Sequence, residues 1–161
     1  RESKIDSLKE LRPKYKTRAG RTVYGGGGIT PDIYLPFKNS INSETRKVVR
    51  NPKRPFFNFA SRFSSDHQSK FKSFVDFKNN WKVTPAILDS FFIHLTQDSI
   101  NFAQDSLLKD SAYIENQLKS ELAGTIWGKN ESTNIRLQFD NQVLEALKHF
   151  NEADAFVKPI D

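Results

Sequence analysis

The sequence predicts an α+β fold that is predominantly α, with a short β-strand or hairpin segment at the N-terminal end followed by a small helical bundle. Two observations carry this prediction. Between residues 14 and 37, β-branched and aromatic triplets flank a glycine-containing connection, a pattern typical of paired strands. From about residue 65, apolar residues recur with the 3.6-residue period of amphipathic helices. With 161 residues, 37% of them hydrophobic, the chain is long enough to bury a real core.

Three short strands are expected in the first part of the chain, at Tyr15–Thr17, Thr22–Tyr24 and Ile33–Leu35. The connection between the first two contains Gly20, which can take the positive φ that a tight hairpin needs. Pro36 is expected to end the third strand because proline has no backbone N–H to donate to a neighbouring strand.

Four consecutive glycines, Gly25–Gly28, come after the second strand. Glycine loses more conformational entropy on folding than any other residue, so such a run is either a disordered linker or a backbone with a demanding path. Apolar and β-branched residues on both sides argue against a linker, which would have polar flanks. We expect the run to let the backbone pass close to another surface; the alternative is a flexible exit from the hairpin.

Residues 38–64 are expected to form an irregular connection. Ser43 can cap a short helix that ends near Val49, and Pro52 and Pro55 are expected to interrupt the chain after that helix. Several phenylalanines in this segment would pin it to a core, namely Phe56, Phe57, Phe59 and Phe63.

Residues 65–155 are expected to form a bundle of three or four helices. Ser64 or Ser65 can cap the first helix, Thr84 followed by Pro85 is a strong start signal for the second, and Gly128 is the expected stop of the third. The apolar positions are Phe71, Phe74 and Val75 in the first helix; Ile87, Leu88, Phe91, Phe92 and Leu95 in the second; Ile114, Leu118, Leu122 and Ile126 in the third; and Ile135, Phe139, Val143, Leu147 and Phe150 in the fourth.

The net charge of +6 is unevenly distributed, with +9 in residues 1–56 and −3 in residues 57–161. A basic segment can bind nucleic acid or a membrane surface. Here the cations are spread out without an interleaved pattern of stacking aromatics, so we favour a solvated surface and expect no nucleic-acid partner. No apolar run approaches the length of a membrane span, and the lack of cysteine excludes disulfides and thiol catalysis.

No catalytic, metal-binding or cofactor-binding motif is found. The three histidines, His67, His94 and His149, lie on separate predicted helices without metal-ligand spacing. Asp66 and His67 stand beside serines, but neighbours on one helix cannot reach each other in the geometry of a catalytic triad. The glycine run does not continue into Gly-Lys-Ser/Thr, which argues against a phosphate-binding loop.

The segment from Tyr15 to Asp32 resembles the carboxyl-terminal processing peptidases, also called tail-specific proteases, which are serine peptidases with a Ser/Lys dyad. The version with Tyr-Gly-Gly-Gly-Gly-Ile is similar to a subgroup that has a long helical extension after the protease core, and residues 84–128 also fit that extension. The resemblance implies structural roles for the positions that match the family motif, which are Gly20, Arg21, Tyr24, Gly25, Gly26, Gly27, Gly28, Ile29, Pro31 and Asp32.

The resemblance implies an organisation in three parts. Residues 1–37 would be the last strands of the peptidase core, residues 38–64 a connecting loop with a short helix, and residues 65–161 a C-terminal helical extension. In the family, the catalytic serine and lysine and a PDZ domain precede this segment. The chain is therefore expected to be the C-terminal fragment of a serine-type endopeptidase, inactive alone, with no cofactor.

The resemblance also implies partners and a location. Partners would be the upstream peptidase core and PDZ domain, the protein or peptide substrates of the parent, and a second copy through an orphaned strand edge. The location would be the cell envelope. Two other classes stay open: a non-catalytic helical protein-interaction module, and a nucleic-acid binder that uses the basic N-terminal segment.

Overall fold

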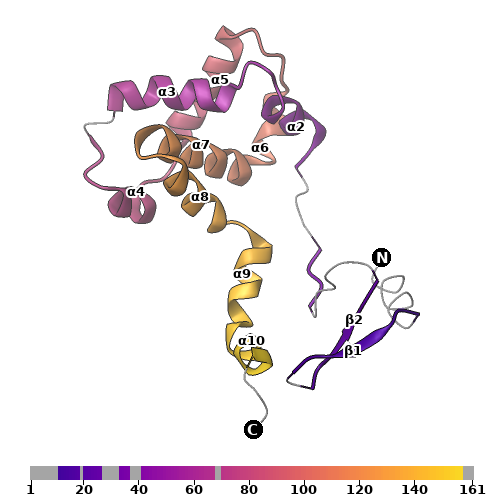
Figure 1. Ribbon diagram of the computed structural model, residues 1–161. Coiled ribbons are helices and arrows are strands. Elements are labelled where there is room, and N and C mark those ends of the chain that lie inside the picture. The colour runs from indigo at the N-terminus through magenta and orange to yellow at the C-terminus, as the bar shows by residue number, and fades with distance from the viewer. Residues whose placement is uncertain (1–10, 19, 27–32, 37–40, 68–69, 158–161) are drawn as a thin grey trace. The chain divides into compact units, whose positions relative to one another are not determined.

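The computed structural model describes residues 11–18, 20–26, 33–36, 41–67 and 70–157 (Figure 1). The chain divides into two compact units. One, here called the hairpin unit, consists of Arg1–Lys38 and Asn141–Asp161; the other, the helical body, is Asn39–Asp140. The fold is α+β and predominantly α, with a two-stranded antiparallel hairpin near the N-terminus, as the sequence predicts.

The expected hairpin is present in the hairpin unit. Strand β1 (Lys14–Lys16) pairs antiparallel with β2 (Thr22–Tyr24), and Tyr15 lies opposite Val23. The strand expected at Ile33–Leu35 is wrong, because residues 33–36 have no regular structure. A strand needs a partner for its backbone groups, and the sheet formed by the described residues contains β1 and β2.

The unit also contains two helices, α9 (Asn141–Lys148) and α10 (Phe150–Val157). The side-chain amide of Gln142 donates to the Leu35 carbonyl at 2.8 Å and so ties the start of α9 to the segment that comes after the hairpin. None of the residues of α9 is buried.

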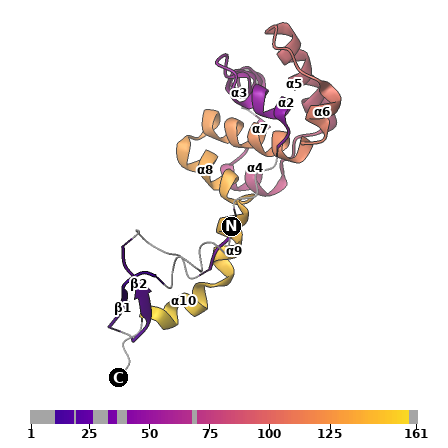
Figure 2. The same ribbon diagram turned by 90° about the vertical axis from the view of Figure 1, so that its right-hand side faces the viewer.

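The helical body consists of seven helices among its described residues, drawn from two sides in Figures 1 and 2: α2 (Ser43–Val49), α3 (Pro55–His67), α4 (Phe74–Asn80), α5 (Pro85–Gln97), α6 (Gln104–Leu108), α7 (Ser111–Ile126) and α8 (Lys129–Leu137). Helix α7 is central, because it packs against both α3 and α8. No helix in the described part of the chain is both long enough and apolar enough to cross a bilayer.

The prediction that residues 38–64 form an irregular connection is wrong, because much of this segment is helical. Pro55 does not interrupt a helix but begins α3, where its missing N–H is one of the amides that lack an intrahelical partner in any case. Phe56, Phe59 and Ala60 then fall on one buried face. The expected short helix is present as α2, although its cap is Asn42 instead of Ser43.

The predicted cap at Ser64 or Ser65 is also wrong, since both residues lie inside α3 and donate their hydroxyls to the Ser61 carbonyl. The cap of the next helix is Ser73, whose side chain accepts from the Asp76 amide at 3.2 Å. The helix bundle expected from residue 65 onward therefore begins earlier and includes α2 and α3.

The second and third predicted helices are confirmed as α5 and α7. Thr84 caps α5 and Pro85 occupies its first turn, as expected. In α7 the predicted apolar face is buried through Leu122, and Gly128 comes after the helix with a φ of 125°. Such a positive φ is favourable for glycine, which explains why the chain turns there.

The predicted fourth helix is wrong, because its residues form α8, α9 and α10. After α8, the amides of residues 138–140 donate to the carbonyls three residues earlier, and these tight bonds end the helix. Ile135 is fully buried whereas Phe150 is 65% exposed, so the apolar residues do not share one core face.

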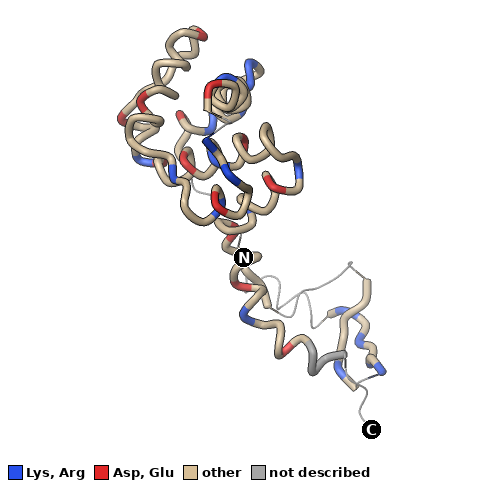
Figure 3. The backbone as a smooth tube through the Cα atoms, turned by 90° about the vertical axis from the view of Figure 1, so that its left-hand side faces the viewer, with Lys and Arg blue, Asp and Glu red and all other residues tan. Residues whose placement is uncertain are grey.

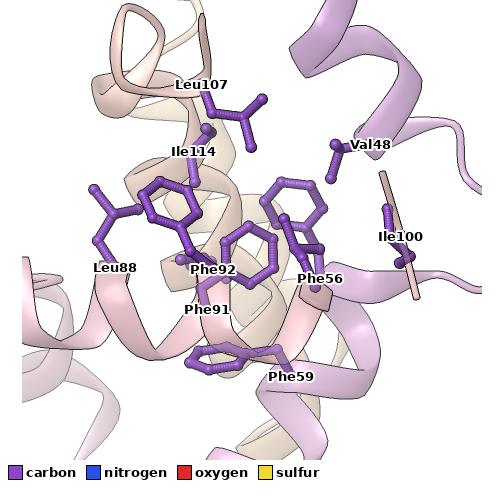
Figure 4. Packing of buried hydrophobic residues seen from close by; sticks show 11 residues of the cluster. Val48, Phe56, Phe59, Leu88, Phe91, Phe92, Ile100, Leu107 and Ile114 are labelled. Atoms are coloured by element: carbon purple, nitrogen blue, oxygen red, sulfur yellow. The ribbon is translucent and has the colours of Figure 1, made fainter. Parts of the chain in front are cut away.

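The larger hydrophobic cluster lies between α3, α5 and α7. Figure 4 shows aromatic side chains from α3 and α5 pointing toward one another. The Phe91 ring, fully buried, lies 4.7 Å from the Phe56 ring and 5.4 Å from the Phe59 ring. Helix α2 joins this cluster through Val48, and Asn42 fixes its start by donating from its side chain to the Ser106 carbonyl. The helical body thus includes α2 as an integral part.

A second cluster, rich in aromatic rings, joins α4 to α7 and α8. The Phe77 ring packs against both Trp81 and Trp127, at centroid distances of 4.8 and 5.0 Å. Lys119 of α7 lies beside this cluster, with its ammonium 5.6 Å from the centre of the Phe77 ring.

Candidate functional site

The hairpin is the first candidate site, because it carries the described part of the peptidase-like motif. Its five-residue connection closes with two backbone hydrogen bonds, from Thr17 to Arg21 and from Gly20 to Thr17, both at 2.9 Å. Gly20 has a φ of 74°, as the sequence predicts for this turn. The Thr17 hydroxyl accepts from the Arg21 amide at 3.1 Å and fixes the return of the chain into β2.

The remaining motif residues lie at the end of β2 and beyond it. Tyr24, half-buried, ends the strand, and the Lys14 ammonium lies 5.9 Å from its ring centre. The Gly25 amide donates to the Pro13 carbonyl at 2.8 Å, which extends the strand pairing by one bond. Gly26 has a φ of 79°, where a side chain would be strained. The other motif positions, Gly27, Gly28, Ile29, Pro31 and Asp32, lie outside the described residues.

A close approach of the backbone is found at Gly25. A Cβ atom on this residue would lie 2.6 Å from Cε2 of Tyr15, far inside van der Waals contact. The neighbour at this point is a ring of the same hairpin. The sequence predicts that the glycine run passes against another surface, which under the family resemblance would be the peptidase core. It does not predict the contact with Tyr15, because the pairing register that brings Tyr15 beside Gly25 is a property of the folded hairpin.

The hairpin is strongly basic, as Figure 3 shows. Lys14 and Lys16 lie on β1, Arg18 lies in the connection and Arg21 stands at its end. The residues of β1 are exposed, whereas those of β2 are half-buried. Lysine on an exposed edge strand opposes uncontrolled strand addition, because a second basic edge would be repelled.

The serine-histidine stretch at the end of α3 has no catalytic geometry. Ser64 and Ser65 donate to the Ser61 carbonyl, and Nδ1 of His67 lies 2.9 Å from the Phe63 carbonyl. The His67 ring also stacks on the Phe63 ring at 4.1 Å. These side chains are engaged by their own helix.

Lys119 has one property that a Ser/Lys dyad requires, because burial, assisted by repulsion from Lys82, lowers its pKa. Its ammonium, however, donates to the carbonyls of Lys78 and Trp81 at 2.8 and 2.7 Å. Both carbonyls belong to the C-terminal end of α4, where helices leave acceptors without partners. The contacts of Lys119 are those of a helix cap.

His94 is the most buried of the described histidines and is part of a charged cluster between α3 and α5. Its side chain is 4% exposed. Nδ1 lies 3.2 Å from Nη1 of Arg62 on α3, and Nε2 lies 3.6 Å from a carboxylate oxygen of Asp98, the residue that caps the end of α5. Arg62 also approaches Asp98, at 3.7 Å.

The pKa of His94 is lowered from its ordinary value of 6.5, chiefly because burial disfavours the charged ring. Asp98 acts in the opposite direction, Arg62 lowers the pKa further and the Pro55 backbone raises it. Sequence reasoning treated His94 as structural or solvated and missed this cluster. The spacing in the sequence indicates one contact of this cluster, because Asp98 lies four residues after His94, where side chains on a helix can meet. Arg62 is too distant in sequence for any local pattern to place it beside His94.

The structure also has a shallow depression of about 210 Å³ beside α5. Its lining mixes rings with polar groups and consists of Asp89, Phe92, Ile93, Thr96, Phe102 and Gln104. The Thr96 hydroxyl donates to the Phe92 carbonyl and is therefore engaged by its own helix. Among the described residues, no three His, Cys, Asp or Glu side chains are grouped so as to hold a metal ion.

Comparison with known proteins gives one family. A model described as a family of unknown function (DUF8443) matches residues 46–128, which is just over half of the chain. The chain belongs to this family. Neither a curated protein nor a solved structure matches the chain.

The part shared with the DUF8443 family runs from α2 to the end of α7. It includes the His94 cluster and the whole of α3, α5 and α7, whose packing forms the larger core. The hairpin precedes the matched residues, whereas residues 84–128, whose sequence was compared above with a helical extension, lie within them.

Proposed function

We propose that this chain is the C-terminal part of a serine-type endopeptidase of the carboxyl-terminal processing family. In this proposal the hairpin completes the sheet of the peptidase core, and the helical body is a non-catalytic extension that positions substrates or partners. The catalytic serine and lysine and the PDZ domain would come from preceding sequence of the same parent. A cell-envelope location is part of the same proposal.

The hairpin is the observation that carries the proposal. Its sequence, from Tyr15 through the glycines, is the part that resembles the family, and the structure gives the described portion a strand–turn–strand form. Three residue pairs in two strands are marginal in water without further strands or a packed face. A hairpin of this kind is therefore well suited to serve as the last strands of a larger sheet.

The helical body supports the non-catalytic role assigned to it. The described groups that resemble catalytic ones are used for structure: Lys119 caps α4 and the serines near His67 bond to their own helix. A Ser/Lys peptidase needs an unengaged lysine with a lowered pKa beside a serine, and backbone amides that hold the oxyanion. We therefore expect no peptide-bond hydrolysis by the chain alone.

The test compares this chain with a longer protein that includes the coding sequence before Arg1. Both are incubated with an unstructured protein substrate and with a fluorophosphonate probe that labels activated serines. We expect turnover and labelling at one serine in the longer protein, and neither in the chain alone. Turnover by the chain alone, or a longer protein that is not labelled and does not hydrolyse substrate, would contradict the proposal.

A substitution in the hairpin connects the activity to this segment. Gly26→Val in the longer protein should reduce substrate turnover, because its φ of 79° strains any β-branched residue beside the sheet. The matched control is Val75, which is 64% exposed on α4 and far from the motif in sequence; Val75→Ala should leave turnover unchanged.

A second candidate function, protein interaction by the helices, is favoured by α9. Leu144 is 43% exposed and Leu147, one turn further along the helix, is 56% exposed, and no residue of α9 is buried. Hydrogen exchange separates the two candidates. Protection of α9 that appears in the longer protein assigns this apolar face to the peptidase itself, whereas unchanged exchange leaves it for a separate partner.

A further inference from the structure

The contacts of His94 fix the state of its ring. Arg62 is always protonated and has only donors, so Nδ1 must accept the hydrogen bond at 3.2 Å and the ring proton must be on Nε2. Nε2 lies 3.6 Å from a carboxylate oxygen of Asp98 and makes no hydrogen bond of ordinary geometry to the described residues, although the Pro55 backbone also favours the protonated ring. The neutral ring thus connects α5 to α3 through Arg62.

Protonation would change this connection. A proton on Nδ1 would point at the Arg62 guanidinium, so two donors and two positive charges would oppose each other. Arg62 can move away at little cost because its side chain is 64% exposed, whereas His94 is held in the core with its ring 5.7 Å from the Phe59 ring. Asp98, which is near both cations, is then left to pair with the charged ring within α5.

We propose that His94 is a proton-sensitive latch between α3 and α5. With a neutral ring, Arg62 of α3 is bound to His94 and lies near Asp98; with a charged ring, Arg62 is released and the His94–Asp98 pair remains within α5. The charged groups at the latch are Arg62 from α3, Asp98, which caps the end of α5, and Lys53, which lies before α3 and donates to the Asp98 carbonyl at 2.5 Å.

The end of α5 should respond to release of the latch. The Asp98 amide donates to the His94 carbonyl, and the Ile100 amide donates to the Leu95 carbonyl. Ser99, which lies between them in sequence, has a φ of 54°. A residue other than glycine with positive φ is held by the contacts around it. Loss of the Arg62 contact removes one of these restraints, so this turn should open more often at acidic pH.

Nuclear magnetic resonance titration of the intact chain from pH 8 to pH 4.5 tests the latch directly. The imidazole signals of His94 and the guanidinium signals of Arg62 should change with the same midpoint. Arg62→Gln should raise the His94 midpoint, because a positive charge that opposes protonation is removed. The control is Arg46→Gln, which changes an exposed arginine on a different helix, α2, and should leave the His94 midpoint unchanged. An unchanged midpoint in Arg62→Gln, or Arg62 signals that do not follow His94, would overturn the proposal.

Hydrogen exchange gives an independent readout. After correction for intrinsic exchange, protection of the Asp98 and Ile100 amides should fall roughly fivefold between pH 7.5 and pH 5, as expected for the loss of one hydrogen bond. In His94→Gln, whose amide oxygen can accept from Arg62 at every pH, this change should vanish, while His67→Gln should keep it. Equal pH responses in wild type and a folded His94→Gln would refute the latch; if His94→Gln does not fold, the Arg62→Gln titration decides.

Discussion

Lys119 joins α7 to the end of α4, and its removal gives a direct test of how this part of the helical body is stabilised. Lys119→Met removes the ammonium that donates to the carbonyls of Lys78 and Trp81 but keeps a side chain of similar length. The two carbonyls then lose their charged donor. Methionine can still lie over the Phe77 ring, so the change removes mainly the two hydrogen bonds.

The magnitude is set by the geometry. Hydrogen bonds to a charged group contribute about 1.5–3 kcal/mol when buried. Because Lys119 is only half-buried and solvent screens its charge, we take about 1 kcal/mol for each bond. Lys119→Met should therefore lower the free energy of unfolding by about 2 kcal/mol. With a urea m-value of about 1.5 kcal/mol/M, the midpoint should fall by about 1.3 M.

Tryptophan fluorescence during urea unfolding is the assay. The chain has two tryptophans, Trp81 and Trp127, and both contact Phe77, so the signal reports on this cluster. The control is Lys82→Met, which removes an exposed cation that repels Lys119 and should leave the midpoint unchanged or slightly higher. A Lys119→Met midpoint within about 0.2 M of wild type would show that water satisfies these carbonyls and that our reasoning is wrong.

Three further predictions concern the core, the hairpin and pH. Leu118→Ala, at a fully buried position of α7, should cost about 3 kcal/mol and lower the melting temperature by roughly 10–20 °C; a shift below about 5 °C would contradict close packing there. Gly26→Ala should weaken the hydrogen-exchange protection of the hairpin amides more than Gly25→Ala does. The backbone of Gly26 has a positive φ, which strains alanine, whereas the exposed Tyr15 ring can move away from a new Cβ at Gly25. A larger loss of protection in Gly25→Ala would refute this. The pKa of His94 is lower in the folded protein than its ordinary value of 6.5, so the unfolded chain binds the proton first as the pH falls. The contribution of the neutral His94 ring to the free energy of unfolding is therefore complete above about pH 6.5 and declines below it. Calorimetry at pH 7.5 and pH 5.5 should show a smaller loss of stability in His94→Gln, and an equal loss would contradict this assignment.

The elements that sequence reasoning found have signals within a few residues of themselves. The α5 start is specified by Thr84 and Pro85, because a hydroxyl cap and a fixed φ act on the adjacent turn whatever the rest of the chain does. The same is true of Gly20, where a tight connection between two β-prone triplets requires positive φ. These local requirements also gave the fold class correctly.

The errors arose where a local signal had two meanings. Pro55 can interrupt a helix or begin one, and its role here depends on the burial of Phe56 and Phe59 against α5 and α7. Ser64 is a favourable N-cap residue when considered alone, but the burial of Phe56 and Phe59 stabilises α3, which continues past Ser64. The period from Ile135 to Phe150 fits one helix, yet only Ile135 reaches the core.

The sequence by itself therefore determined that this chain has a basic hairpin followed by amphipathic helices, because capping, turn geometry and helical period are local properties of the backbone and its nearest side chains. The tertiary structure alone decided where those helices end and what the functional groups touch. Arg62 and His94 are 32 residues apart, and Lys119 reaches carbonyls 38 and 41 residues away. Contacts at such separations form only when packing brings distant helices together, and no local pattern encodes them.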